Sequence, residues 1–169
     1  LGLDGVLGLG SVVVMQRYAK KGRLPHLVLI SAYSNGGVNP GLVDFALDVA
    51  GPDRALGFLT QYDADTGEPP AADTDVIRAA ARKHPRRILL LDWVDHSLPH
   101  HSDQAPDGWF LPDLFHPNFT GAQEFTDFVA GSLRYAKRGK FPGRSSVAAT
   151  AAVALVVAFS ERGGGWKGG

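Results

Sequence analysis

The chain has 169 residues, of which 44% are hydrophobic, and its 17 Lys plus Arg balance 17 Asp plus Glu. This length fits one domain with a substantial core, and a charged fraction of 20% beside so much apolar sequence argues against a disordered chain. Zero net charge argues against a nucleic-acid-binding protein, and the absence of Cys excludes thiolate catalysis, disulfide bonds and Cys-ligated zinc.

Apolar periodicity predicts helices that alternate with short strands. Helices are predicted over 11–21, 40–50, 73–83 and 118–135, and strands over 27–33, 55–61 and 88–93. Ser11 is expected to cap the first helix and Gly22 to end it, and Asp73 or Thr74 is expected to cap the third. The last helix is expected to turn five residues inward: Ala122, Phe125, Phe128, Val129 and Leu133.

Strands that are apolar throughout and alternate with helices predict a parallel sheet covered on both faces. The predicted fold is therefore α/β: a three-layer α/β/α sandwich with a doubly wound, flavodoxin-like sheet, formed by residues 1–136. Residues 137–169 are predicted to be a separate tail with a basic collar, a short apolar run and a Gly-rich end.

The apolar run 147–159 is too short to cross a bilayer, which takes roughly 20 apolar residues. Three interpretations stay open for it. It forms a terminal helix that packs on the domain or a poorly ordered extension, it associates with a membrane together with the basic residues from 134 onward, or it covers an exposed edge of the sheet.

Two motifs follow predicted strands, where α/β folds place their chemistry. Asp113 precedes His116 by three residues, so its carboxylate can accept the imidazole Nδ1 proton and leave Nε2 as a general base. Asn35 follows the first predicted strand, and its amide can donate a hydrogen bond to an oxyanion. The alternative is that both motifs are ordinary turns, with Asn118 as a helix cap.

The loop 92–119 also carries imidazole, carboxylate and aromatic groups. Asp95, His96, His100, His101 and Asp103 could hold zinc through nitrogen and oxygen atoms, although a solvated polar loop is the simpler interpretation. Three aromatic residues flank the same loop and could stack on a sugar or belong to the core: Trp93, Trp109 and Phe110.

Three stretches together resemble the SGNH (GDSL-type) hydrolase family, and most closely the SGNH domain at the C-terminus of bacterial membrane acyltransferases. In chain order they are GRLPHLVLISAYSNGG from Gly22, FLTQYDADTGEPPAADTDVIRAAARKHPRRILLLDW from Phe58, and DGWFLPDLFHPNFTGAQEF from Asp107. The resemblance extends from about residue 22 to 133.

This resemblance implies a serine esterase or O-acyltransferase that acts on acyl esters, often acetyl groups of sugars, without cofactor or metal. It makes Asp113 and His116 the acid and base of a Ser-His-Asp triad. It also makes Asn35, with Ser34 and Gly36, the oxyanion and substrate-binding segment. The implied partner is a small-molecule or carbohydrate ester and not a nucleic acid, and the implied location is extracytoplasmic or membrane-associated.

The chain departs from the family in two places. Tyr33 and Ser34 stand where the family has a glycine before its Asn, and the Gly-Asp-Ser nucleophile motif is absent. Ser11 is expected to be a helix cap and not the nucleophile, because the family places a further strand and helix between its serine and its asparagine. The nucleophile, with its strand and helix, is therefore expected upstream of Leu1. The alternative is a non-catalytic α/β binding or scaffold domain.

Overall fold

The computed structural model describes residues 6–31, 37–69, 71–137 and 153–157. Its helices are α1 (Val6–Lys20), α2 (Pro40–Ala50), α3 (Ala71–Lys83), α4 (Trp93–Ser97) and α5 (Phe119–Tyr135), with a single 3₁₀ turn over Leu98–His100. Its strands are β1 (Leu27–Ser31), β2 (Ala55–Leu59), β3 (Ile88–Leu91) and β4 (Val153–Val157).

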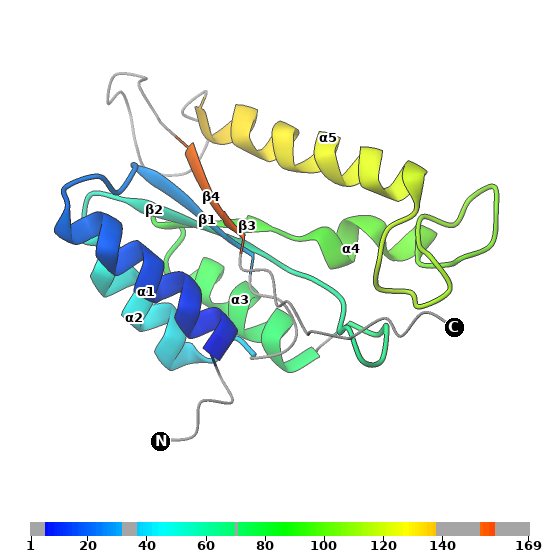
Figure 1. The fold of residues 1–169 in the computed structure, drawn as a ribbon, viewed down its shortest axis with the longest axis horizontal. Coiled ribbons are helices and arrows are strands. Elements are labelled where there is room, and N and C mark those ends of the chain that lie inside the picture. The colour runs from blue at the N-terminus through cyan, green and yellow to red at the C-terminus, as the bar shows by residue number, and fades with distance from the viewer. Residues whose placement is uncertain (1–5, 32–36, 70, 138–152, 158–169) are drawn as a thin grey trace, which may run out of the picture.

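The described strands form one parallel sheet in the order β3-β2-β1-β4. Helices α1, α2 and α3 cover one face, and α4 and α5 lie on the other (Figure 1). The chain moves from β1 to β2 to β3, and β4 then pairs with the opposite edge of β1. This reversal beside β1 is the point at which doubly wound sheets bind their ligands. The predicted three-layer α/β sandwich is confirmed.

Alternate residues of β1, β2 and β3 enter two different cores, as the pleat of a strand requires. Val28 and Ile30 of β1 pack toward α1, α2 and α3, whereas Leu29 packs on the opposite face. The second core is aromatic: Trp93 is buried and packs edge-on against Phe125 of α5, with ring centroids 5.1 Å apart. This aromatic core holds α5 and the loop before it on the sheet.

Two predicted helices are confirmed to within a residue. Helix α2 spans the predicted 40–50, and the Asn39 side chain caps it by accepting a hydrogen bond from the Leu42 N–H at 2.9 Å. Helix α5 begins after Asn118, whose side chain accepts from the Gly121 N–H at 3.0 Å. Both helices therefore begin directly after an Asn whose side chain accepts a hydrogen bond from an otherwise unpaired helix N–H group.

Two predicted caps are wrong. Helix α1 begins at Val6, so Ser11 lies inside it and is 1% exposed; burial of the helix face outweighs the roughly 1 kcal/mol penalty that each nearby glycine imposes. Helix α3 begins at Ala71, which places Asp73 and Thr74 within its first turns. Thr74 is buried there, so packing decides where this helix begins.

Two smaller predictions also need correction. Ala122 is exposed, whereas the other four residues predicted to face inward from α5 pack on the aromatic core. The long loop after β3 contains α4 and the 3₁₀ turn, because Asp92 ends the strand and caps α4 by accepting from the Asp95 N–H.

The apolar tail contributes a strand and not a terminal helix. Strand β4 pairs in parallel with β1, with Val153 opposite Leu27 and Val157 opposite Ser31. Its β-branched valines suit a strand, and they cover an edge of β1 that would otherwise expose backbone groups. Within the described ranges no helix is long and apolar enough to cross a membrane. The rest of the tail, 138–152 and 158–169, lies outside the described residues.

Candidate active site

Asp113 and His116 occupy the tip of a hairpin-like loop between the 3₁₀ turn and α5. Phe110 and Pro117 form an antiparallel bridge at its base, and the Leu111 N–H donates to the His116 carbonyl at 2.8 Å. At the tip, Leu114 adopts a φ of +53°, which is uncommon for a residue with a branched side chain. The loop therefore has a defined conformation that brings residues 113 and 116 together.

The two side chains are hydrogen-bonded as the sequence predicts. His116 Nδ1 lies 2.7 Å from Asp113 Oδ2, while Asp113 Oδ1 accepts from the backbone N–H groups of His116 at 2.9 Å and Phe115 at 3.0 Å. Slight burial favours the neutral Asp113 carboxyl, but the hydrogen bonds and charge from His116 outweigh it, so the pKa of Asp113 lies below its ordinary value.

This arrangement leaves the other imidazole nitrogen available as a base. An ionised carboxylate only accepts hydrogen bonds, so the proton shared with Asp113 sits on Nδ1 of His116 and Nε2 presents its lone pair. The His116 side chain is 63% exposed and that of Asp113 is 47% exposed. The base can therefore be reached from solvent without any movement of the fold.

Contacts from the carboxyl end of β2 fix the loop in place. Gly67 has a φ of +70°, and a Cβ atom there would lie 2.6 Å from the Asp113 carbonyl oxygen and 3.0 Å from Leu114 Cβ. His101 Nε2 donates to the Leu114 carbonyl at 2.9 Å, and its ring stacks on Tyr62 at a centroid distance of 4.0 Å. The Asp113–His116 pair thus lies at the carboxyl edge of the sheet.

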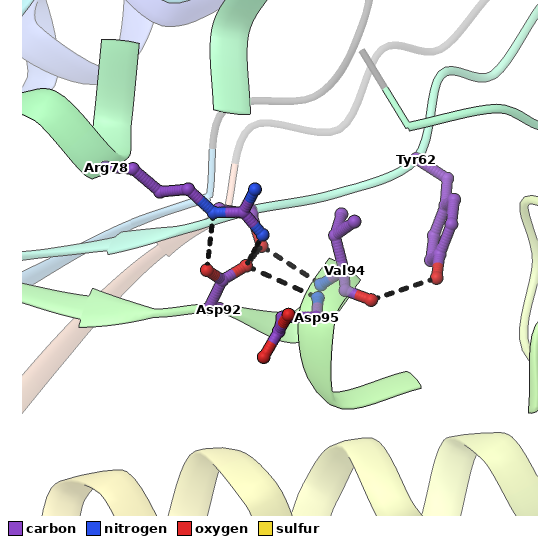
Figure 2. A network of polar contacts seen from close by, with 6 residues as sticks. Tyr62, Arg78, Asp92, Val94 and Asp95 are labelled. Atoms are coloured by element: carbon purple, nitrogen blue, oxygen red, sulfur yellow. Dashed lines mark hydrogen bonds and ion pairs between the residues drawn. The ribbon is translucent and has the colours of Figure 1, made fainter. Parts of the chain in front are cut away.

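A second polar network lies where β2 and β3 end (Figure 2). Arg78 of α3 donates from Nε to Asp92 Oδ2 at 2.7 Å and from a terminal nitrogen to Oδ1 at 3.0 Å. The Thr60 hydroxyl donates to Asp92 Oδ1 at 2.9 Å and accepts from the Val94 N–H at 3.0 Å. The Tyr62 hydroxyl donates to the Val94 carbonyl at 3.2 Å, and burial raises the pKa of this hydroxyl.

This network is structural, because the Asp92 carboxylate is surrounded by protein donors. Partial burial opposes ionisation of Asp92, but hydrogen bonds from Arg78 and Thr60 outweigh it and lower its pKa. Asp92 joins α3, the end of β2 and the start of α4, the helix that leads toward the loop of Asp113 and His116. The network therefore sets where that loop leaves the sheet.

We expect Arg78→Met to lower the free energy of unfolding by about 2 kcal/mol, because it removes a two-fold charge-assisted hydrogen bond from a partly buried carboxylate. Lys83→Met is the matched control on the same helix. Its cation lies 3.9 Å from Asp44, both side chains are mostly exposed, and its loss should change stability by no more than about 0.5 kcal/mol. Urea unfolding of both variants measures the difference, and equal effects would contradict this account.

The lowered pKa values of Asp92 and Asp113 predict loss of stability in acid. A group whose pKa is lower in the folded state stabilises the fold above its unfolded pKa, about 3.9 for Asp, and this contribution disappears as the pH falls through the folded value. Asp92→Asn should therefore be less stable than wild type near neutral pH, with a difference that shrinks below about pH 3.5. Urea unfolding of wild type and Asp92→Asn at neutral pH and at acidic pH measures this change. An equal stability difference at the two pH values would contradict a lowered pKa for Asp92.

The other predicted site residues have different outcomes. Tyr33, Ser34, Asn35 and Gly36 lie outside the described residues, so the structure leaves the oxyanion segment untested. Ser11 is buried in α1, which lies on the opposite face of the sheet from α5 (Figure 1).

Serines near the carboxyl edge are already hydrogen-bonded within the fold. The Ser31 hydroxyl accepts from Gln61 Nε2 at 2.8 Å. The Ser97 hydroxyl donates to the Trp93 carbonyl at 2.7 Å and lies 3.0 Å from the Tyr62 hydroxyl. Within the described ranges the side chain of His116 contacts Asp113 and Phe115, and no serine hydroxyl is hydrogen-bonded to it.

The imidazoles of the possible zinc site in the loop 92–119 contact different side chains. His96 stacks on Phe128, His100 stacks on Trp109 and bonds the Asp107 carbonyl, and His101 is held by Tyr62. Among the residues with a described position, no group of three or more His, Asp or Glu side chains could hold a metal ion. The clustering in sequence therefore reflects ring packing along one loop.

The aromatic residues beside this loop are mainly core. Trp93 and Phe110 are buried, and only the partly exposed Trp109 reaches solvent. The interpretation of Trp93 and Phe110 as sugar contacts is wrong, because both rings are buried in the aromatic core.

Sequence reasoning missed the residues that position the site. Thr60, Arg78 and Gly67 have no local motif, although Thr60 lies at the end of a predicted strand and Gly67 follows that strand. No family model matches the chain, and no curated protein matches it.

Proposed function

We propose that this chain is the base-and-acid part of an SGNH-like serine esterase or O-acyltransferase domain that acts on acyl esters, acetyl esters foremost. The observation that carries the proposal is the 2.7 Å contact between His116 Nδ1 and Asp113 Oδ2 in an accessible loop at the carboxyl edge of the sheet. Asp-oriented imidazoles of this kind serve as general bases for hydroxyl nucleophiles.

In the proposed mechanism, a serine outside residues 1–169 attacks the ester carbonyl. Nε2 of His116 takes the serine proton as the Oγ–C bond forms, and Asp113 stabilises the resulting imidazolium through Nδ1. His116 then gives the proton to the leaving alcohol as the ester bond breaks. The Asn35 amide is proposed to donate to the oxyanion, and water or a sugar hydroxyl then takes the acyl group.

The charge around the site favours an uncharged acyl group. The segments 60–69 and 92–118 contain no Lys or Arg, and their charged residues other than Asp92, which is paired with Arg78, are all acidic: Asp63, Asp65, Glu68, Asp95, Asp103, Asp107 and Asp113. At the same edge, burial raises the pKa of Asp73, and the neighbouring Asp63 charge adds to it. Such a field repels anionic substrates.

An ester assay of the full-length protein tests this proposal. We expect p-nitrophenyl acetate to be hydrolysed with kcat/KM about tenfold higher than the p-nitrophenyl monoester of succinic acid, because the second acyl group adds a carboxylate near the acidic loops. A fluorophosphonate probe should label one serine, and the labelled peptide should lie outside residues 1–169. Hydrolysis with the label on Ser31, Ser97 or Ser102 would contradict the proposed nucleophile.

The alternative is a non-catalytic α/β binding domain. It is favoured by one observation, that no serine in the described part of the chain is hydrogen-bonded to His116. The full-length protein distinguishes the two: absence of both ester turnover and fluorophosphonate labelling would support the binding domain and remove the esterase.

A further inference from the structure

The turn after α1, at the amino-terminal end of the sheet, forms a basic hollow whose cations have no carboxylate partner among the described residues. It has a volume of about 210 Å³ and is lined by Val14, Arg17, Tyr18, Lys21 and Arg23. We propose that this basic hollow binds a phosphate group. The inference is independent of the proposed esterase, because the turn after α1, which lines the hollow, and the loop before α5 lie at opposite ends of the sheet (Figure 1).

The turn after α1 builds the hollow. Gly22 has a φ of +64°, its N–H donates to the Ala19 carbonyl at 2.9 Å, and the Arg23 N–H donates to the Tyr18 carbonyl at 2.9 Å. This pair of bonds is a Schellman motif, which reverses the chain at a helix end. The reversal brings Arg23 back beside Arg17, in the last turn of the helix, and Lys21, directly after it.

Within the described part of the chain, no acid forms an ion pair with these cations. Between residues 5 and 43 the sequence contains no Asp or Glu. The described ion pairs of Arg and Lys involve Arg78 and Lys83, and none involves Arg17, Lys21 or Arg23. A helix C-terminus carries only about half a negative charge, and here the turn satisfies two of its carbonyls, so the local field is positive.

The side chains around the hollow suit a phosphate ligand. A guanidinium group presents paired donors that match two phosphate oxygens, and an ammonium group adds a point charge. The volume of the hollow is several times the roughly 30 Å³ that one water molecule occupies. A phosphate group therefore has room among Arg17, Lys21 and Arg23. The exposed Tyr18 hydroxyl is a further donor at the rim.

Phosphate can come from a small molecule or from a lipid headgroup, and the test separates them. The full chain is titrated at low salt with inorganic pyrophosphate in a calorimeter. It is also sedimented with vesicles of phosphatidylcholine, with and without phosphatidylglycerol. Saturable pyrophosphate binding identifies a free phosphate compound. Binding to phosphatidylglycerol vesicles without pyrophosphate binding identifies the lipid headgroup.

Single substitutions show whether the hollow is the site. Arg17→Gln, Lys21→Gln and Arg23→Gln should each weaken the observed binding about tenfold, whereas Lys20→Gln should change it by less than about twofold. Lys20 is the matched control, because it is an exposed neighbour of the same charge that does not line the hollow. Equal weakening by Lys20→Gln and Lys21→Gln, or no binding to either probe, would overturn the proposal.

Discussion

Replacing His116 by Ala in the full-length protein is expected to lower kcat/KM for p-nitrophenyl acetate by about a thousandfold. The imidazole whose Nδ1 lies 2.7 Å from Asp113 is the group that we propose takes the serine proton. Without it the nucleophile stays a neutral hydroxyl, so turnover and fluorophosphonate labelling should both fall. Steady-state kinetics at neutral pH measure the loss.

His26→Ala is the control for this experiment. His26 is an exposed imidazole at the amino end of β1, so its removal should leave turnover unchanged. Asp113→Asn should lower kcat/KM by at least about a hundredfold, because an amide cannot stabilise the imidazolium. If His116→Ala keeps normal turnover while the protein remains folded, the proposed mechanism is wrong.

The contact between Asp113 and His116 could be predicted because it is local. They are three positions apart, and a carboxylate at that spacing can accept both the ring N–H and the backbone N–H groups of one turn. The Arg78–Asp92–Thr60 network could not be predicted this way. Asp92 is 14 residues from Arg78 and 32 from Thr60 in sequence. The three residues meet only because β2 pairs with β3 and α3 packs against β3.

The same distinction explains which helix ends were predicted. Helix α2 has strong local signals, since Pro40 fits the first turn and Gly51 with a φ of +71° ends it. Helix α1 instead continues through Gly8 and Gly10 back to Val6, because its apolar face packs against α2 and β4. Helix propensity and a plausible cap at Ser11 therefore predict the wrong first residue for α1, because tertiary burial determines where this helix begins.

The hairpin-like loop that carries Asp113 and His116 is anchored at one glycine of α5. A Cβ atom at Gly121 would overlap the Trp109 carbonyl oxygen and lie 3.0 Å from both the carbonyl carbon and Cβ of Trp109. That carbonyl also accepts from the Asn118 N–H at 2.9 Å, and the Asn118 amide donates to the Gly108 carbonyl at 2.8 Å. A side chain at residue 121 must therefore displace backbone that is held by several hydrogen bonds.

We expect Gly121→Ala to lower the free energy of unfolding by about 2 kcal/mol or more, although Ala is the better helix former by up to about 1 kcal/mol. Gly131→Ala in the same helix is the control. Its Cβ would meet only a flexible Arg134 nitrogen at 3.9 Å, so helix propensity alone should act and stabilise the protein by about 0.5–1 kcal/mol. Urea unfolding of the two variants should thus shift in opposite directions. A stabilised Gly121→Ala protein would show that close packing of α5 on Trp109 does not hold the hairpin-like loop in place.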